Sequence, residues 1–313
     1  MAHATSNSAA GQSLGNALGQ KLWQAVGSLV QPPVPAWQSV PAWQNGQAVA
    51  NRAQVIAVCA QKGGVGKTTT AVHLAAGLAL RHGLKVLILD LDAQGHVASS
   101  LRAHVRSSAP VALSQAMLSP EPDLLTAVLP TTVAGLDITG ADKQLSNAEA
   151  QMASRMGRDL ILARALRLAR GRYDAIVIDC PPNLGLLTLN ALFAADHLVV
   201  PCDLSVLALE GVDDLMRTLQ MLQGTLGRAP QLLGLLHTRV DRRNHKQNAA
   251  MRRAIAQSYA GLSLQTEIGV NTALPGAQLT GQTVYAAAPD STGARDYSDL
   301  ADEVFGRLFA ATR

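Results

Sequence analysis

The sequence predicts an α/β fold, in which a mostly parallel, twisted sheet is flanked by helices on both faces. Apolar segments of strand length alternate with segments of helical periodicity from residue 54 onward. Two of the predicted strands, residues 86–89 and 176–178, are apolar throughout, as strands buried on both faces are. A glycine-rich turn follows the first predicted strand, at the sheet edge where such folds bind ligands.

The elements follow one another in a regular order. An apolar run predicts the first strand at residues 55–60, and threonines after the glycine-rich turn open a helix at 68–81. A strand at 85–91 leads into short helices at 97–102 and 113–118 and a longer helix at 146–170. The strand at 175–179 stops before two prolines. After it we expect helices at 184–194, 209–226, 246–259 and 297–310, with strands at 197–201 and 232–238.

The first 53 residues differ from the rest of the 313-residue chain. They are rich in small and polar residues and proline, and the pentapeptide VPAWQ occurs at residues 34–38 and again at 40–44. Closely spaced prolines exclude helix and favour an extended form. We therefore expect residues 1–53 to be a flexible extension, in which the repeated tryptophans are either docking anchors or part of a disordered tail. Residues 54–313 form the predicted main domain.

Composition suggests a protein with a large core. Hydrophobic residues make up 48% of the sequence but aromatic residues only 3%, so leucine, alanine and valine must build that core. Cys59, Cys180 and Cys202 lie in or beside apolar strands, which favours small buried side chains in a reducing cytosol. The N-terminus lacks a signal-peptide pattern, and no apolar run is long enough to cross a bilayer. We therefore expect a cytoplasmic protein.

Residues 61–70, QKGGVGKTTT, have the pattern of a phosphate-binding loop. Glycines let successive N–H groups point at an anion, and the N-terminus of the following helix adds partial positive charge. Lys67 can reach the β- and γ-phosphates of a nucleotide, and the Thr68 hydroxyl can ligate Mg²⁺. The strict spacing of this motif requires glycine where the chain has Gln61, and a second lysine, Lys62, stands at the start of the loop. One phosphate site rarely needs two lysines from one loop.

Carboxylates follow two of the predicted strands. Asp90 and Asp92 stand at the end of the strand at 85–91, and Asp179 ends the strand at 175–179. In P-loop folds the strand beside the loop ends in an aspartate that holds Mg²⁺, usually through water. Asp179 fits that position. Of Asp90 and Asp92, one can align the attacking water and the other can support the metal or the loop lysine.

Taken together, these segments resemble the ParA/MinD family of deviant Walker A ATPases, in its ParA (partition) branch. KGGVGKTTT at residues 62–70 is similar to the family's phosphate loop, and DLDAQG at 90–95 to its DxDPQG element. DCPPNLGLLTLNAL at 179–192 and ALEG at 208–211 resemble segments of the ParA branch. Ala93 departs from the pattern, because the family usually has proline there. The resemblance runs from residue 55 to the C-terminus.

The resemblance implies a slow, Mg²⁺-dependent, partner-stimulated ATPase in which two subunits enclose two ATP molecules. Lys62 would reach the phosphates of the other subunit and Asp92 would orient the hydrolytic water, so these two are the expected catalytic residues. Thr68 and Asp179 would hold Mg²⁺. Because a lysine acting across the dimer stabilises triphosphate charge only in the dimer, ATP should control dimerisation. The expected nucleotide-binding residues are Lys62, Gly63, Gly64, Val65, Gly66, Lys67, Thr68 and Thr69.

A basic cluster late in the chain is the expected DNA-binding surface, and Asp241 is the one acidic residue that the sequence sets against it. The resemblance implies that the ATP dimer binds DNA and associates with the nucleoid. Contacts to phosphates need only positive charge on one face, so binding should be sequence-independent and salt-sensitive. The expected DNA-binding residues are Arg239, Arg242, Arg243, Lys246, Arg252 and Arg253.

The leading hypothesis is segregation of plasmid or chromosomal DNA with a ParB-like adaptor protein. A second hypothesis keeps the ATPase but gives it a protein cargo, such as a chemoreceptor cluster, a carboxysome or a division-site complex. A third is a MinD-like membrane switch, which would end in a basic amphipathic helix. Val304, Phe305 and Leu308 with Arg307 imitate such a helix only weakly. We expect the last helix to pack on the sheet and no stable membrane association.

Overall fold

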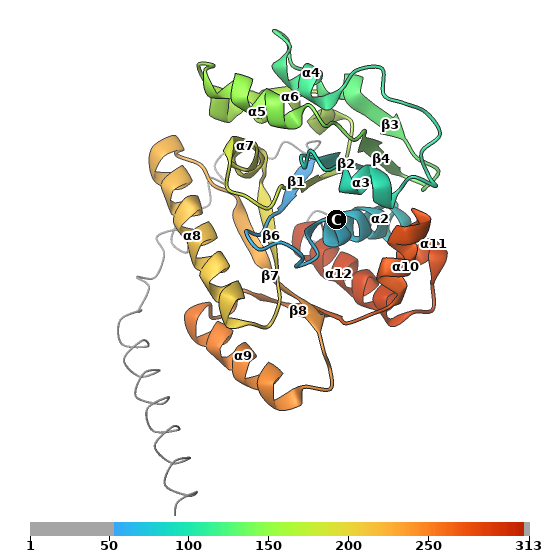
Figure 1. Cartoon of the computed structure of the whole chain (residues 1–313), viewed down its shortest axis with the longest axis vertical. Coiled ribbons are helices and arrows are strands. Elements are labelled where there is room, and N and C mark those ends of the chain that lie inside the picture. The colour runs from blue at the N-terminus through green and yellow to red at the C-terminus, as the bar shows by residue number, and fades with distance from the viewer. Residues whose placement is uncertain (1–52, 310–313) are drawn as a thin grey trace, which may run out of the picture. The chain divides into compact units, whose positions relative to one another are not determined.

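A computed structural model describes residues 53–309, without the side chains of residues 206 and 207. Its centre is an eight-stranded sheet with strand order β3-β4-β2-β5-β1-β6-β7-β8 (Figure 1). All neighbouring strands in it are parallel except β3 and β4, which confirms the predicted fold class. The strands are β1 (Gln54–Val58), β2 (Val86–Asp90), β3 (Val128–Pro130), β4 (Leu136–Thr139), β5 (Ala175–Asp179), β6 (His197–Cys202), β7 (Gln231–Val240) and β8 (Ser263–Gly269). The predicted extension at 1–53 lies outside the described residues, apart from Ala53.

Helices cover both faces of the sheet (Figure 1). One face shares a core with α2 (Lys67–His82), α3 (His96–Ser100) and α12 (Thr292–Leu308), and α10 (Ala273–Thr280) and α11 (Val284–Ala287) pack beside α12. The other face shares a core with α4 (Leu113–Leu118), α5 (Leu145–Ala153), α6 (Ile161–Ala165), α7 (Leu186–Ala194), α8 (Val206–Leu226) and α9 (His245–Ser258). Short 3-10 helices are η2 (Leu124–Ala127), η3 (Arg158–Leu160) and η4 (Ala169–Gly171).

The two cores meet at the strands, whose side chains alternate between them. In β1, Val55 and Ala57 belong to the core under α4 to α8, whereas Ile56 and Val58 belong to the core under α2 and α12. All four side chains are fully buried. This two-sided burial explains why the central strands read as continuous apolar runs in the sequence. The strand order places the carboxyl ends of β2, β5, β1 and β6 next to one another. The loops that carry the candidate functional residues begin there.

The predicted helix at residues 146–170 is wrong. The chain there is divided into α5, η3, α6 and η4. The break falls at Gly157, whose φ of 68° lies in the left-handed region and cannot continue a right-handed helix. The sequence-based prediction also lacks β3, β4 and β8. Each of these strands lies toward the outside of the sheet. β4 and β8 carry polar residues and β3 has only three residues, so local periodicity does not identify them.

Both outer strands are irregular. The pairing of β8 with β7 shifts register between Leu235 and His237. Beside this irregularity the backbone N–H groups of Gln265 and Thr266 donate to the two carboxylate oxygens of Glu303 on α12, each at 2.9 Å. On the opposite side β3 has three residues and ends in the exposed Pro130, which has no N–H group to donate.

The C-terminal helix packs on the domain, as expected. Leu300, Ala301 and Val304 of α12 are buried in the core shared with α2 and β8. The apolar face of α12 is therefore used in folding. Among the helices of residues 53–309, none has both the length and the apolar character that crossing a membrane requires.

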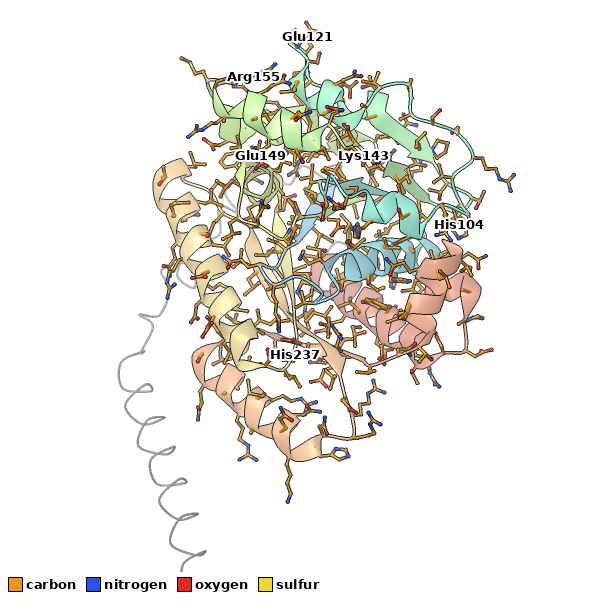
Figure 2. All side chains as sticks on the ribbon, viewed as in Figure 1. His104, Glu121, Lys143, Glu149, Arg155 and His237 are labelled. Atoms are coloured by element: carbon orange, nitrogen blue, oxygen red, sulfur yellow. The ribbon has the colours of Figure 1, made fainter. Side chains whose placement is uncertain are left out.

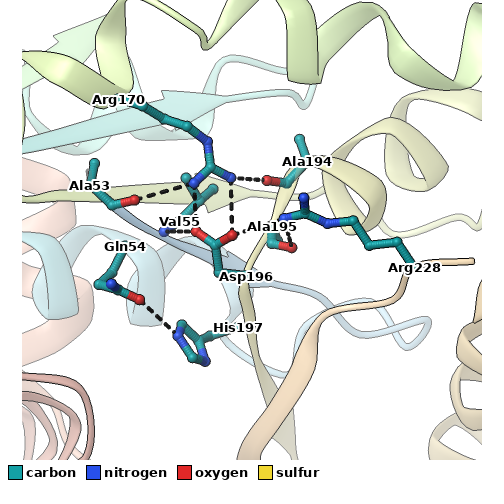
Figure 3. Close-up of polar contacts among 9 residues, drawn as sticks. All are labelled: Ala53, Gln54, Val55, Arg170, Ala194, Ala195, Asp196, His197 and Arg228. Atoms are coloured by element: carbon teal, nitrogen blue, oxygen red, sulfur yellow. Dashed lines mark hydrogen bonds and ion pairs between the residues drawn. The ribbon is translucent and has the colours of Figure 1, made fainter. Parts of the chain in front are cut away.

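An ion network at the amino ends of the strands fixes the entry into β1 (Figure 3). The carboxylate of Asp196 accepts hydrogen bonds from Arg170 at 2.7 and 3.2 Å, from Arg228 at 2.8 Å and from the Val55 N–H at 3.0 Å. Arg170, which is nearly fully buried, also donates to the Ala53 carbonyl group. Burial alone would raise the pKa of Asp196, but the hydrogen bonds and charge of Arg170, helped by Val55 and Arg228, hold that pKa below its ordinary value.

Asp196→Asn should lower the free energy of unfolding by about 3–5 kcal/mol, because it leaves the buried Arg170 guanidinium without its counter-charge. The depressed pKa of Asp196 means that its contribution is present above the unfolded pKa of about 3.9 and is lost as the pH falls through the lower folded pKa. Denaturant unfolding across acidic pH checks both points. The difference in the free energy of unfolding between wild type and variant should be constant above about pH 5 and should decrease below it.

Asp214→Asn is the matched control, because the ion pair of Asp214 with Arg217 is exposed on α8. We expect it to change stability by less than about 1 kcal/mol. An Asp196→Asn protein as stable as this control at neutral pH would contradict a stabilising role of the network.

Candidate functional site

The glycine-rich loop lies between the end of β1 and the start of α2, as predicted. Gly64 and Gly66 have φ angles of 74° and 86°, in the left-handed region that favours glycine. Gly66 is the N-cap of α2, and no side chain caps the N–H groups of this helix. The positive end of a 16-residue helix therefore faces the loop without a competing side chain, which is the arrangement that binds a phosphate group.

The two loop lysines have different surroundings. Lys67 is nearly buried, and its Nζ donates to the Lys62 carbonyl oxygen at 3.2 Å. The Nζ of Lys62 turns away from the loop: it lies 2.7 Å from Oδ2 of Asp203 and 3.3 Å from Oγ of Ser205. The structure thus places Lys67 inside the loop and Lys62 on an acidic partner of its own subunit.

Asp203 is a functional-site residue that the sequence-based prediction missed. It follows β6 directly, as Asp179 ends β5, so a carboxylate after a buried strand was the available signal. Burial favours its neutral form, but the hydrogen bonds from Lys62 and Ser205 and the charges of Lys62 and Arg239 lower the pKa of Asp203 below its ordinary value. Asp203 is therefore charged near neutral pH and holds Lys62 as an ion pair.

Asp179 stands beneath the loop at the end of β5 and is fully buried. Neither of its carboxylate oxygens makes a hydrogen bond of good geometry within residues 53–309. Burial raises the pKa of Asp179 well above its ordinary value and the charge of Asp90 adds to this rise, whereas the Thr68 hydroxyl and the Lys67 ammonium oppose it. A buried carboxylate is costly unless a cation pairs with it. The position beside Thr68 therefore suits a cation, and Mg²⁺ binding by Thr68 and Asp179 stays a prediction.

Asp90 and Asp92 have different surroundings, and which of them aligns water stays a prediction. Asp90 is buried, pairs in register with Asp179, and uses both oxygens on the loop that follows it: it accepts from the N–H groups of Asp92 and Val97 at 3.1 and 3.0 Å. Burial raises the pKa of Asp90 to about 7. Asp92 is half-buried and accepts one hydrogen bond, from the Gln94 N–H at 3.0 Å. Asp90 thus shapes the loop, and Asp92 remains accessible for chemistry.

A hydrogen bond with a neighbouring helix holds the segment that follows Asp179. Glu149 of α5, labelled above α7 in Figure 2, accepts a hydrogen bond from the Leu187 N–H at 3.2 Å, in the first turn of α7. Asn183, in the same segment, accepts a hydrogen bond from the Thr188 hydroxyl at 2.6 Å through its carbonyl oxygen. Contacts at both ends of this turn hold the chain that leaves the acidic strand.

The cysteines are buried free thiols, as expected. Cys202 lies 3.6 Å from Nδ1 of His237, whose Nε2 lies 3.1 Å from the Ser263 hydroxyl; Figure 2 labels His237 near β7. Burial lowers the pKa of His237, so this ring is neutral at physiological pH. These groups belong to the packing between β6, β7 and β8.

The basic cluster is more neutralised than the sequence suggests. Arg242 pairs with Asp296 at 2.8 Å and Arg252 pairs with Glu267 at 2.6 Å, so the expectation that Asp241 alone opposes the cluster is wrong. Arg243 does pair with Asp241, at 2.8 Å. Asp296 and Glu267 come from α12 and β8, which approach only after folding.

Two basic side chains of the cluster, both on α9, are exposed and are not neutralised by an ion pair within the described residues. Lys246 and Arg253 are both exposed, lie seven residues apart on α9, and form no ion pair with any side chain of the described part of the chain. Residues at this spacing share one face of a helix. Arg239 lies elsewhere, because its Nη1 donates to the Gly64 carbonyl oxygen of the phosphate loop at 3.1 Å.

The parallel sheet, the glycine-rich loop before α2 and the buried aspartate at the end of the neighbouring strand define a P-loop nucleotide-binding protein. A family model described as an AAA domain matches residues 53–231. With the relatives below, this match establishes that the chain belongs to the ParA/MinD family of deviant Walker A ATPases.

Relatives similar over most of the chain include the chromosome-partitioning ATPase Soj of Thermus thermophilus, which is 41% identical over 81% of this chain and 96% of its own length. The sporulation initiation inhibitor protein Soj of Bacillus subtilis is 37% identical over 80% of this chain and 98% of its own. The chromosome partitioning protein ParA of Caulobacter vibrioides is 34% identical over 82% and 96%.

Solved structures agree with the fold. The crystal structure of cobyrinic acid a,c-diamide synthase from Mycobacterium smegmatis with bound ATP analogue and magnesium has a TM-score of 0.69 and 33% identity, over 83% of this chain and 97% of that one. A variant of McdA from Cyanothece in complex with ATP has a TM-score of 0.72 over 82% and 97% of the chains, and its 22% identity supports the fold alone.

At a pH at which the Asp179 carboxyl group is ionised, Asp179→Asn should stabilise the nucleotide-free protein by about 1–3 kcal/mol, because it removes a buried charge that lacks a hydrogen-bond partner of good geometry among the described residues. The same change should remove most of the stabilisation that Mg²⁺ with ADP gives to the wild type, since ligand binding stabilises only through the folded site. Denaturant unfolding with and without Mg²⁺ and ADP measures both effects.

Asp203→Asn is the matched control at the same edge of the sheet. The carboxylate of Asp203 already has Lys62 and Ser205 as partners, so its removal should not stabilise the nucleotide-free protein. An Asp179→Asn protein less stable than wild type without nucleotide would contradict the interpretation of Asp179 as an unpaired charge.

Proposed function

We propose that this protein is a Mg²⁺-dependent ATPase whose ATP-bound form is a homodimer that binds DNA without sequence preference. With a ParB-like adaptor protein it segregates plasmid or chromosomal DNA. The observation that carries this proposal is the second lysine, Lys62, in the phosphate loop of a chain whose relatives are named chromosome-partitioning proteins. ATP and Mg²⁺ as ligands are supported by the bound ATP analogue and magnesium of the related Mycobacterium smegmatis structure.

The residues of one subunit divide the work within the site. Lys67 and the N–H groups of the loop bind the phosphates. When the nucleotide binds, the Nζ of Lys67 leaves the Lys62 carbonyl oxygen and contacts a phosphate instead. Thr68 and Asp179 hold Mg²⁺, which when bound neutralises charge between the β- and γ-phosphates. Asp92 orients the attacking water from the accessible end of β2.

Lys62 supplies the link between nucleotide and dimer. In the nucleotide-free subunit its ammonium is satisfied by Asp203 at 2.7 Å. The triphosphate of the other subunit offers more negative charge than one carboxylate, so Lys62 exchanges partners when two loaded subunits meet. Hydrolysis removes the terminal phosphate, Lys62 returns to Asp203, and the subunits separate.

The DNA surface is centred on the exposed face of α9. Lys246 and Arg253 contribute the open charges, and Arg243 extends the surface into the preceding loop. Arg242 and Arg252 stand beside it as paired arginines. Dimerisation doubles this positive surface, so DNA affinity follows ATP, and the protein is held at the nucleoid in its ATP state.

Other cargo remains the second functional hypothesis, because residues 54–313 carry the ATPase and not the identity of what it moves. A membrane switch has less support. The apolar residues of α12 that would insert into lipid, above all Val304, pack in the core against α2 and β8.

Variants of the two catalytic candidates should separate dimerisation from hydrolysis. Lys62→Ala should bind ATP but remain monomeric, and Asp92→Ala should dimerise with ATP but not hydrolyse it. Asp203→Asn should dimerise at an ATP concentration several-fold lower than wild type, because Lys62 no longer has a competing partner in its own subunit. Light scattering and phosphate release measure these outcomes. Normal dimerisation and turnover by Lys62→Ala would refute the cross-subunit role.

The double variant Lys246→Ala/Arg253→Ala should bind random-sequence duplex DNA at least tenfold more weakly in its ATP state. The slope of log affinity against log salt concentration should be smaller in magnitude by about 3.6, since the ATP-bound dimer loses two phosphate contacts from each subunit. Fluorescence anisotropy over a salt series measures both quantities. Arg217→Ala removes an exposed arginine from α8 and should leave the slope unchanged. Equal binding with ADP and ATP would contradict the nucleotide-controlled switch.

A further inference from the structure

Arg239, near the end of β7, has an unusual backbone. Its φ is 53°, and among residues 53–309 it is the only residue other than glycine with a positive φ. The left-handed conformation is unfavourable for an L-residue with a Cβ. Such strain persists only when the surrounding structure imposes it, and it often accompanies a functional site.

The contacts of Arg239 point to the phosphate loop. Its Nη1 donates to the Gly64 carbonyl oxygen at 3.1 Å. The preceding residue, Thr238, is buried, and its hydroxyl donates to the Val65 carbonyl oxygen at 2.8 Å. Two consecutive side chains of β7 therefore hold two consecutive carbonyl groups of the loop.

These contacts determine where the loop N–H groups point. In a trans peptide the C=O and N–H bonds point in opposite directions. The carbonyl of Gly64 shares its peptide group with the N–H of Val65, and the carbonyl of Val65 shares its own with the N–H of Gly66. By drawing the two carbonyl groups toward β7, Arg239 and Thr238 turn these N–H groups away from it. An anion-binding loop needs its N–H groups converging on the ligand before the ligand arrives.

The hydrogen bond from Arg239 to the loop is better able to persist when a phosphate binds than the hydrogen bond from Lys67 to the loop. Lys67 holds the Lys62 carbonyl oxygen with the same Nζ that would bind phosphate. Arg239 approaches the loop from β7 and has four further N–H donors. It can therefore hold the Gly64 carbonyl group and still add positive charge near the nucleotide.

We propose that Arg239 is a positioning residue of the nucleotide site, which fixes the Gly64–Val65 peptide group for phosphate binding and is not primarily part of the DNA surface on α9. This inference rests on the proposed ATPase function for the identity of the ligand. It reassigns one of the residues that the sequence groups with the basic cluster. The strained backbone and the contact to the loop occur at the same residue, which is consistent with this role.

Arg239→Gly is the informative variant. Glycine adopts a φ of 53° without strain, so the substitution removes the guanidinium without destabilising the fold. We expect its thermal midpoint without nucleotide to equal or exceed that of wild type, while the dissociation constant for ATP with Mg²⁺, measured by calorimetry, rises about tenfold. The KM for ATP should rise with little change in kcat, because the lost interaction acts on binding. Arg239→Asn, which also tolerates this conformation, should behave like the glycine variant.

Arg217→Ala serves as the control for loss of one exposed positive charge and should leave ATP affinity unchanged. Unchanged ATP affinity in Arg239→Gly, with wild-type protein binding ATP normally, would overturn the positioning role and leave the proposed ATPase intact. A loss of affinity accompanied by a matching loss of thermal stability would overturn it as well, because that pattern indicates damage to the fold. Wild-type protein that binds no ATP would refute both.

Discussion

The site depends on one electrostatic constraint: the buried carboxyl group at the end of β5 lies beside the first residues of α2, where the positive end of that helix is. Asp179 has no hydrogen-bond partner of good geometry among the described residues, and the first turn of α2 has no side-chain cap. Each group is unfavourable alone in a folded protein. A metal ion bound to a phosphorylated ligand satisfies both at once, so the site is prepared for its ligand at the expense of stability.

The rest of the carboxyl edge compensates for this imbalance with contacts inside one subunit. Asp203 neutralises Lys62, Asp90 is used by the backbone of its own loop, and the Gly64 and Val65 carbonyl groups are held from β7. A ligand therefore meets cations that are already positioned. In the proposed cycle, the two lysine side chains exchange these contacts for phosphates.

Local features were predictable from the sequence and contacts between distant segments were not. The phosphate loop, β5 and the carboxylates at the ends of β2 and β5 follow from apolar runs and glycine spacing, which act over a few residues. Asp296 and Glu267 neutralise arginines far away in the chain, and no local pattern predicts those pairs. The same limit explains the strand β8, whose polar sequence is stabilised by β7 and α12, and Arg239, whose neighbours in sequence suggest DNA while its neighbours in space are the phosphate loop.

The two margins of the sheet have a consequence for self-association. Sheets with free outer strands tend to recruit further strands and grow into larger aggregates. Here Glu303 occupies backbone donors beside the β8 irregularity, and at the other margin Pro130 terminates a three-residue strand. Both margins thus discourage the addition of further strands to the sheet, so association through the sheet edges is disfavoured.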